Sequence, residues 1–266
     1  MANDLIPVSR PARPLLLTEL PRAVAEGAAI PSAWPILRRA PRGDGHAVVT
    51  ISAIAGDDAT GLPLKLFLRY LGYDATGWDH GMSFGTTRLQ RDKLEAFVAG
   101  LFERSGRKVS LIGHSIAGTT ARELARARPD MIRQVITLGT PLGGSLSRET
   151  NIWPLVEALT GVIAPEVSTV AKRRLATAPL VPSTSVYSRT DGVVDWKACI
   201  QTPGLGSGTA AENVEVRSSH AGMMVNPSVL YVVADRLAQP EFAWAPFERK
   251  GWRVLAFPKP AKPRRR

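Results

Sequence analysis

Three residue types that together support nucleophilic catalysis follow three separate apolar segments of this chain. Ser115 stands directly after the run from Val109 to His114 and before an alanine-rich segment with helical character. A buried strand that turns sharply into a helix leaves such a serine on a strained corner, with its hydroxyl exposed above the helix N-terminus. The pattern therefore predicts that Ser115 is a nucleophile.

A serine hydroxyl needs a general base, and this chain has four histidines. His220 follows an expected strand at 213–216, where the chain order Ser, Asp, His places the base. His114 adjoins the serine and is expected to point away from it, and His46 precedes the first long strand. We predict that His220 is the base, with His80 as the alternative.

The base needs an acid that lies between the serine and the histidine in sequence, at the end of a strand. Asp191 follows the expected strand at 184–188, and Gly192 lets the loop turn sharply. Its expected role is to hold His220 in one tautomer and to stabilise the imidazolium formed during attack. Asp195 is the rival, and it is better explained as a loop-capping or surface residue.

The negative oxygen of a tetrahedral intermediate needs backbone N–H donors. One is expected from Ile116, directly after the nucleophile. The other is expected from the loop that follows the first long strand, with Ala53 or Ile54 as the donor. Backbone donors leave little trace in side-chain identity, so this second assignment rests on position in the chain alone.

Strand-like and helix-like segments alternate along residues 46–258, which indicates one α/β domain. A parallel sheet with helices on both faces follows from this alternation, because parallel strands need right-handed crossovers. The strands are expected at 47–55, 73–78, 108–112, 134–138, 184–188 and 213–216, and the helices at 61–71, 87–104, 116–128 and 227–237.

Three segments fall outside this alternation. Residues 1–45 are rich in proline and arginine and are expected to form an arm packed on the domain. The segment at about 145–182 has apolar residues and prolines but no clear strand, which favours a helical cap over the serine rather than helices that only fill the core. Residues 259–266 are expected to form a basic disordered tail.

The formal charge of +11 is concentrated at one end, because five cations stand in the last eight residues. No basic patch interleaved with aromatic residues is found elsewhere, so nucleic acid is not an expected partner. No apolar run approaches the roughly 18 residues that span a bilayer, so stable membrane insertion is not expected either. A single cysteine, Cys199, excludes an internal disulfide and favours a cytoplasmic location. No spacing of cysteine or histidine predicts a metal, and no motif predicts a cofactor.

Taken together, these motifs resemble the α/β-hydrolase superfamily in its bacterial esterase and lipase-like branch. The resemblance spans residues 46 to 237, and the matching segments are 113–118, 138–141, 188–194 and 219–223. Two positions depart from the usual pattern: Ala117 stands where G-x-S-x-G has its last glycine, and residues 51–54 lack the His-Gly or Pro-Gly of many relatives. The resemblance implies an α/β-hydrolase fold with Ser115, Asp191 and His220 as the catalytic residues.

The expected activity is hydrolysis of a small-molecule carboxylic ester through an acyl-enzyme, and the apolar cap segment favours a hydrophobic acyl group. One alternative keeps the chemistry but changes the acceptor, which gives an acyltransferase or thioesterase on lipid-like acyl groups. A further alternative is a non-catalytic binding protein with the same fold. No pattern in the chain predicts an oligomeric state.

Overall fold

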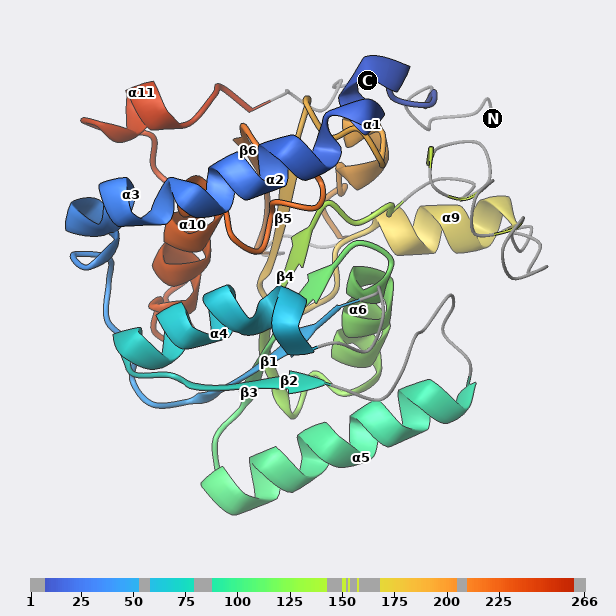
Figure 1. Ribbon diagram of the computed structural model, residues 1–266. Coiled ribbons are helices and arrows are strands. Elements are labelled where there is room, and N and C mark those ends of the chain that lie inside the picture. Colours follow the sequence, from blue (N-terminus) through green and yellow to red (C-terminus); the bar gives the residue numbers. More distant parts are fainter. Residues whose placement is uncertain are drawn as a thin grey trace.

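The fold is organised around a six-stranded sheet in which all described strands run parallel, in the order β2-β1-β3-β4-β5-β6 (Figure 1). The computed structural model describes residues 8–52, 58–78, 88–142, 150, 151, 153, 157, 168–204 and 210–260. The strands are β1 Ala47–Ile51, β2 Asp74–Trp78, β3 Val109–His114, β4 Ile132–Leu138, β5 Ser183–Ser188 and β6 Ala211–Val216.

The central strands are buried along their whole length, which explains their nearly continuous apolar sequences. Successive residues point to opposite faces, so Val48 and Ile112 join one core cluster while Val49 and Leu111 join another. A sheet with two apolar faces needs helices on both. The sequence predicted this parallel, doubly covered sheet, and the prediction is confirmed.

Five helices cover the two faces of the sheet. On one face lie α3 Ile30–Leu37, α4 Asp58–Leu71 and α10 Pro227–Leu237, while α5 Arg88–Ser105 and α6 Ala117–Ala127 cover the other. The sequence predicted four of these helices, and each of the four begins and ends within a few residues of the expected bounds. None of the helices in the described ranges is long and apolar enough to cross a bilayer.

The N-terminal residues form two helices that lie over the carboxyl ends of the last strands. These are α1 Arg13–Leu17 and α2 Glu19–Ala28, and Figure 1 shows α2 crossing above β5 and β6. Hydrogen bonds join α2 to the loops that follow these two strands. The remaining short elements are the 3₁₀ helix η1 Trp196–Cys199 and the helix α11 Arg253–Ala256.

The expected cap is described only in part. Residues 143–149, 152, 154–156 and 158–167 lie outside the described ranges, as do 261–266 of the expected tail. The described end of the cap segment contains α9 Thr169–Ala176. Arg122 of α6 is fully buried and donates hydrogen bonds to the carbonyls of Leu175 and Thr177. Helix α6 thus holds this end of the segment, while the cap itself stays a prediction.

Candidate active site

Chain order puts Ser115 at the point where open α/β sheets bind ligands. The chain runs from β1 outward to β2 and then returns to β3 on the other side of β1, so the connection changes direction between β1 and β3. Ligands in such folds bind at the carboxyl ends of the strands beside this switch point. Ser115 directly follows β3, and the end of β1 lies beside it at the same edge, where Ile51 pairs with Gly113.

Ser115 occupies the backbone conformation of a strained corner. Its φ is 55°, and in the described ranges Phe242 is the only other non-glycine residue with a positive φ. This region costs an L-residue about 1–2 kcal/mol, so it persists only where the surroundings enforce it. The N–H of Ser115 donates to the carbonyl of Leu138 at 2.8 Å, which ties the corner to β4. The helix α6 then begins at Ala117.

The turn is tight because two glycines allow the helix to approach the strand. A Cβ on Gly113 would lie 2.4 Å from Cα of Gly118, and a Cβ on Gly118 would lie 2.1 Å from Oγ1 of Thr140. Ala117, the first residue of α6, instead belongs to the core cluster that α5 and α6 form with the sheet. The glycine required for close approach is therefore Gly118, which explains why alanine is tolerated at position 117.

His220 and Asp191 form a buried pair. His220 lies in the loop after β6, and its Nδ1 atom is 2.7 Å from Oδ2 of Asp191 in the loop after β5. Their side chains are 2% and 1% exposed. Because a carboxylate only accepts, Nδ1 carries the proton, and Nε2 of the neutral ring has the free lone pair that a general base needs.

Asp191 is itself held by backbone donors. Its Oδ1 atom accepts hydrogen bonds from the N–H groups of Val193 at 2.8 Å and Val194 at 2.7 Å, which leaves Oδ2 for the histidine. Asp195 has a different role. It accepts from the N–H of Lys197 at the start of η1 and from that of Ser9, so it is a buried capping residue.

The two neighbouring histidines have opposite electrostatic environments. Burial lowers the pKa of His220, but the charge and hydrogen bond of Asp191 and the charge of Glu19 outweigh it and raise the pKa above 6.5. Burial and the nearby His220 lower the pKa of His114 to about 3. His114 is therefore neutral, and its Nε2–H donates to the carbonyl of His220 at 3.0 Å.

The Nε2 atom of His220 is buried and has no hydrogen-bond partner. No hydrogen bond therefore joins it to Ser115 in this structure. An unpaired buried nitrogen costs about 1–3 kcal/mol, so such atoms are rare and call for an explanation. Catalytic hydrogen bonds are often absent without substrate and form only in the Michaelis complex.

Part of the predicted site lies outside the described ranges. Ala53, Ile54 and the alternative base His80 all belong to segments that are not described. Ile116 is the N-cap of α6, at a helix end whose first N–H groups have no intrahelical acceptor. His46 lies at the start of β1, at the other end of the sheet, where Nε2 contacts Oγ of Ser110 at 2.8 Å.

Two glutamates that the sequence did not single out contact the loops that contain Asp191 and His220. Glu19 accepts from the N–H groups of Gly192 and Ala221, and Glu26 accepts from that of Ser219. The sequence feature that could have indicated these two glutamates is their spacing. Residues 19, 22 and 26 share one face of a helix whose other side is apolar. A polar helical face normally indicates contact with solvent, so this signal pointed the wrong way.

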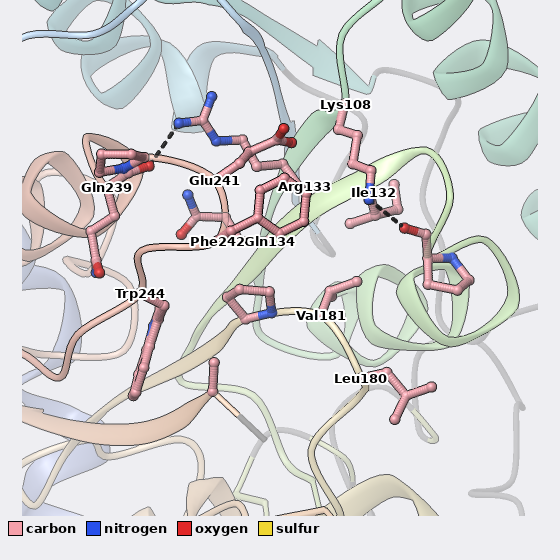
Figure 2. Close-up of a pocket in the computed structure, with 14 residues that line it drawn as sticks. Lys108, Ile132, Arg133, Gln134, Leu180, Val181, Gln239, Glu241, Phe242 and Trp244 are labelled. Carbon is pink, nitrogen blue, oxygen red and sulfur yellow. Dashed lines mark hydrogen bonds between the residues drawn. The ribbon is translucent and has the colours of Figure 1, made fainter. Parts of the chain in front are cut away.

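A cavity of about 590 Å³ lies at the amino ends of β3, β4 and β5 (Figure 2). Leu180, Phe242 and Trp244 give it apolar walls, while Lys108 and Arg133 line it with their side chains bonded to backbone carbonyls. It is at the opposite end of the sheet from Ser115, so it is separate from the predicted catalytic residues. No group of three or more His, Cys, Asp or Glu within the described ranges could hold a metal ion.

Known structures with the same architecture were found, although no family model matches the chain. A crystal structure of Aspergillus fumigatus lipase B superposes with a TM-score of 0.61 at 13% identity, covering 83% of this chain and 60% of that chain. The thioesterase domain from the curacin biosynthetic pathway gives 0.51 at 14% identity, covering 72% and 91%. A pyrethroid hydrolase from Sphingobium faniae gives 0.51 at 17% identity, covering 73% and 98%.

These similarities establish the fold. The parallel sheet, its strand order and its helices on both faces are those of the α/β-hydrolase fold, as the sequence motifs predicted. The chain spans 60% of the length of the fungal lipase. A shared fold does not by itself define an activity, so the function has to be argued from the site.

Proposed function

We propose that this protein is a serine hydrolase that cleaves carboxylic esters through an acyl-enzyme intermediate. The observation that carries the proposal is the buried Asp191–His220 pair with an unpaired Nε2 atom, at the same sheet edge as the strained Ser115. These are the three roles that serine-dependent acyl transfer requires. The lipase and pyrethroid hydrolase folds support ester hydrolysis as the reaction class.

In the first half of the reaction, Oγ of Ser115 attacks the ester carbonyl while Nε2 of His220 takes the hydroxyl proton. Asp191 stabilises the resulting imidazolium through Nδ1. The tetrahedral oxyanion accepts a hydrogen bond from the N–H of Ile116, with Ala53 or Ile54 as the second proposed donor. The intermediate collapses when the bond to the alcohol breaks, and His220 protonates the leaving oxygen.

In the second half, water replaces the alcohol. His220 takes a proton from the water as its oxygen attacks the acyl-serine carbonyl, and the same oxyanion donors stabilise the second intermediate. Breaking the bond to Oγ releases the acid, and the proton on His220 returns to Ser115. No group outside the protein and water is needed to balance these steps.

The decisive experiment combines a fluorophosphonate probe with p-nitrophenyl ester assays. We expect the probe to label Ser115, and Ser115→Ala to abolish labelling and to lower kcat by about 10⁴-fold or more, because the nucleophile is lost. Ser32→Ala is the matched control, since Ser32 is exposed on α3 and bonds only to the carbonyl of Ala29. If the probe fails to label Ser115 and any labelling is insensitive to Ser115→Ala, a non-catalytic binding function for the fold would be favoured.

For the substrate class, we propose esters with hydrophobic acyl groups, because the segment at 145–182 is apolar and precedes the acid in the chain. Rates across p-nitrophenyl esters from acetate to palmitate test this proposal. We expect kcat/KM to rise with chain length. A preference for acetate alone would contradict it.

The curacin thioesterase fold favours one second candidate, transfer or hydrolysis of a thioester-bound acyl group. The acyl-enzyme would be the same, and the acceptor or the leaving group would differ. Partition of products between water and an added alcohol or thiol separates the two candidates. Acyl transfer that exceeds hydrolysis at low acceptor concentration would favour the transferase.

A further inference from the structure

The helix α2 has its polar face turned toward the protein and its apolar face turned toward solvent. Glu19 is 5% exposed, whereas Leu20 and Val24 are each 73% exposed. Surface helices normally show the reverse arrangement. Burial of a carboxylate is costly unless strong hydrogen bonds satisfy it, so the contacts of this inner face need an explanation.

One carboxylate joins the two catalytic loops. Oε1 of Glu19 accepts from the N–H of Gly192 at 2.7 Å, and Oε2 accepts from the N–H of Ala221 at 3.0 Å. These are the residues directly after Asp191 and His220. A displacement of either loop would therefore break a charge-assisted hydrogen bond to a buried group.

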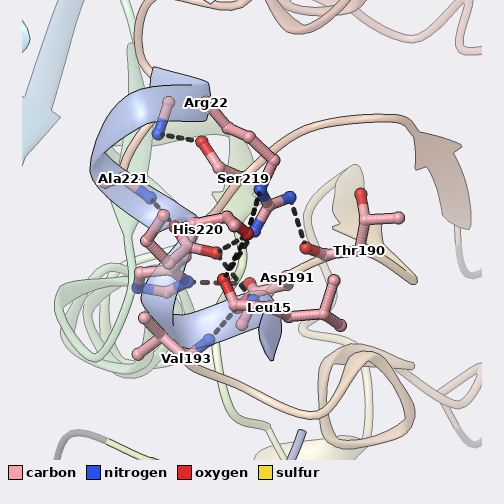
Figure 3. Close-up of polar contacts among 12 residues, drawn as sticks. Leu15, Arg22, Thr190, Asp191, Val193, Ser219, His220 and Ala221 are labelled. Carbon is pink, nitrogen blue, oxygen red and sulfur yellow. Dashed lines mark hydrogen bonds and ion pairs between the residues drawn. The ribbon is translucent and has the colours of Figure 1, made fainter. Parts of the chain in front are cut away.

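Arg22 completes the connection on the side of the acid. Its guanidinium pairs with Oε1 of Glu19 at 2.8 Å and donates to the carbonyl of Thr190 at 2.7 Å (Figure 3). Asp191 is therefore flanked on both sides by residues that α2 holds, namely Thr190 and Gly192. Gly192 also needs to lack a side chain, because a Cβ would lie 2.4 Å from the carbonyl carbon of Leu15.

Glu26 has the same role on the side of the base. Its Oε1 accepts from the N–H of Ser219 at 2.6 Å, and its Oε2 accepts from Oγ of Ser218 at 2.6 Å and Nδ2 of Asn226 at 3.1 Å. Asn226 caps α10, the helix that follows the base loop. His220 is thus flanked by two residues that α2 holds, and its loop is anchored to both helices.

We propose that Glu19, Arg22 and Glu26 are positioning residues, and that α2 holds the acid loop and the base loop in register so that His220 faces Ser115. This inference rests on the proposed hydrolase function for its kinetic consequences. The titration of His220 is a separate consequence, because Glu19 places a second negative charge near the ring in addition to that of Asp191.

Charged and titratable groups reach His220 from three elements. Asp191 comes from the loop after β5, His114 from β3, and Glu19, Arg22 and Glu26 from α2. The charge of Glu19 raises the pKa of His220. Arg22 carries the opposite charge and pairs with Glu19 at 2.8 Å. Loss of Glu19 and loss of Arg22 should therefore move the titration of His220 in opposite directions.

The test uses full-length Glu19→Gln and Arg22→Gln. Glutamine at 19 keeps the size of the side chain, but it removes the charge and sets an NH₂ group against one backbone N–H. We expect kcat to fall about 10- to 100-fold with KM unchanged, since misplaced catalytic groups cost that much. NMR of isotope-labelled histidines should show His220 titrating at lower pH in Glu19→Gln and at higher pH in Arg22→Gln.

Glu95→Gln is the matched control, because it removes the same charge from a partly exposed ion pair with Arg128 on the other face of the sheet. We expect it to change neither kcat nor the titration. An unchanged kcat and an unchanged His220 titration in Glu19→Gln would overturn the proposal. So would shifts of the same sign in the two α2 variants, because both would then report only a general loss of structure.

The two proposals fail in different ways. If Ser115→Ala hydrolyses esters as fast as the unmodified protein, the proposed function is wrong. The opposite shifts of His220 do not depend on turnover, so they still test the role of α2. If Glu19→Gln does not fold, Glu26→Gln supplies the kinetic test, with a loss in kcat expected and an unchanged kcat overturning the proposal.

Discussion

His220 is the residue whose chemistry depends most on its surroundings. Its ring is buried against a carboxylate on one side and has an unpaired nitrogen on the other. The first contact stabilises the protonated ring, while the second leaves the neutral ring ready to accept a proton. A base of this kind is strong but is already protonated in mildly acidic solution.

This balance predicts the pH dependence of activity. His220 must be neutral to accept the serine proton, and its pKa in the folded protein lies above 6.5. We therefore expect kcat/KM to fall as pH decreases, with the midpoint of the acidic limb above pH 6.5. A pH profile of p-nitrophenyl ester hydrolysis measures this midpoint. A midpoint at or below the ordinary histidine value would contradict the assignment of His220.

Asp191 and Asp195 provide a matched pair of buried carboxylates four positions apart. Asp191→Asn keeps the shape but cannot stabilise the imidazolium, so we expect kcat to fall by about 10⁴-fold. Asp195→Asn keeps an acceptor for the η1 cap but sets an NH₂ group against the N–H of Ser9, so it should lower stability and leave kcat nearly intact. Steady-state kinetics and thermal unfolding of both variants check this. A larger kcat loss in Asp195→Asn would make Asp195 the acid.

At the scale of elements, the elbow depends on how closely α6 approaches β3 and the segment after β4. The sequence motif placed the last small residue at Ala117, but the contact that excludes a side chain is at Gly118, against Thr140. The motif therefore identified the turn and Gly113, one of the two glycines on which it depends, but not Gly118.

Gly118→Ala tests this close approach. The added Cβ has no space beside Thr140, so α6 must shift, and we expect a loss of about 1–3 kcal/mol in unfolding free energy together with reduced kcat. Ala117→Gly is the control, with a cost of at most about 1 kcal/mol for glycine in a helix. Urea denaturation and ester assays give both quantities. Equal stability of Gly118→Ala and the unmodified protein would contradict the packing argument.

At the scale of the whole molecule, a buried arginine connects distant parts of the chain. Arg122 in α6 donates to Gln201 at 2.6 Å and to the carbonyl of Thr177 at 2.7 Å. It also donates to Ser183 at the start of β5. Helix α6 is thereby fixed to β5 and to the chain on either side of it.

We expect Arg122→Met to lower the unfolding free energy by about 3 kcal/mol, because several buried acceptors lose their donor. Arg128→Met is the matched control on the same chain segment, where partly exposed ion pairs with Glu95 and Asp130 contribute little. Urea denaturation compares the two. A smaller effect at Arg122 than at Arg128 would show that the buried connection does not stabilise the fold.

The sequence by itself determined the fold class and most element bounds, because the burial of a strand or helix is visible in the types of residues along that segment. The apolar run at 109–114, the turn at Ser115 and the helix after it are all local, so they predict the elbow and its chain order with Asp191 and His220. The bounds of β3 and α10 lay within two residues of expectation for the same reason.

Only the tertiary structure decided which side of α2 faces the protein. Glu19 bonds to residues 173 and 202 positions away, and no local pattern encodes partners at that distance. A helix with one polar and one apolar face is compatible with either orientation until the polar groups of the catalytic loops are in place. The interior hydrogen bonds of those loops, rather than helical periodicity, determined the outcome.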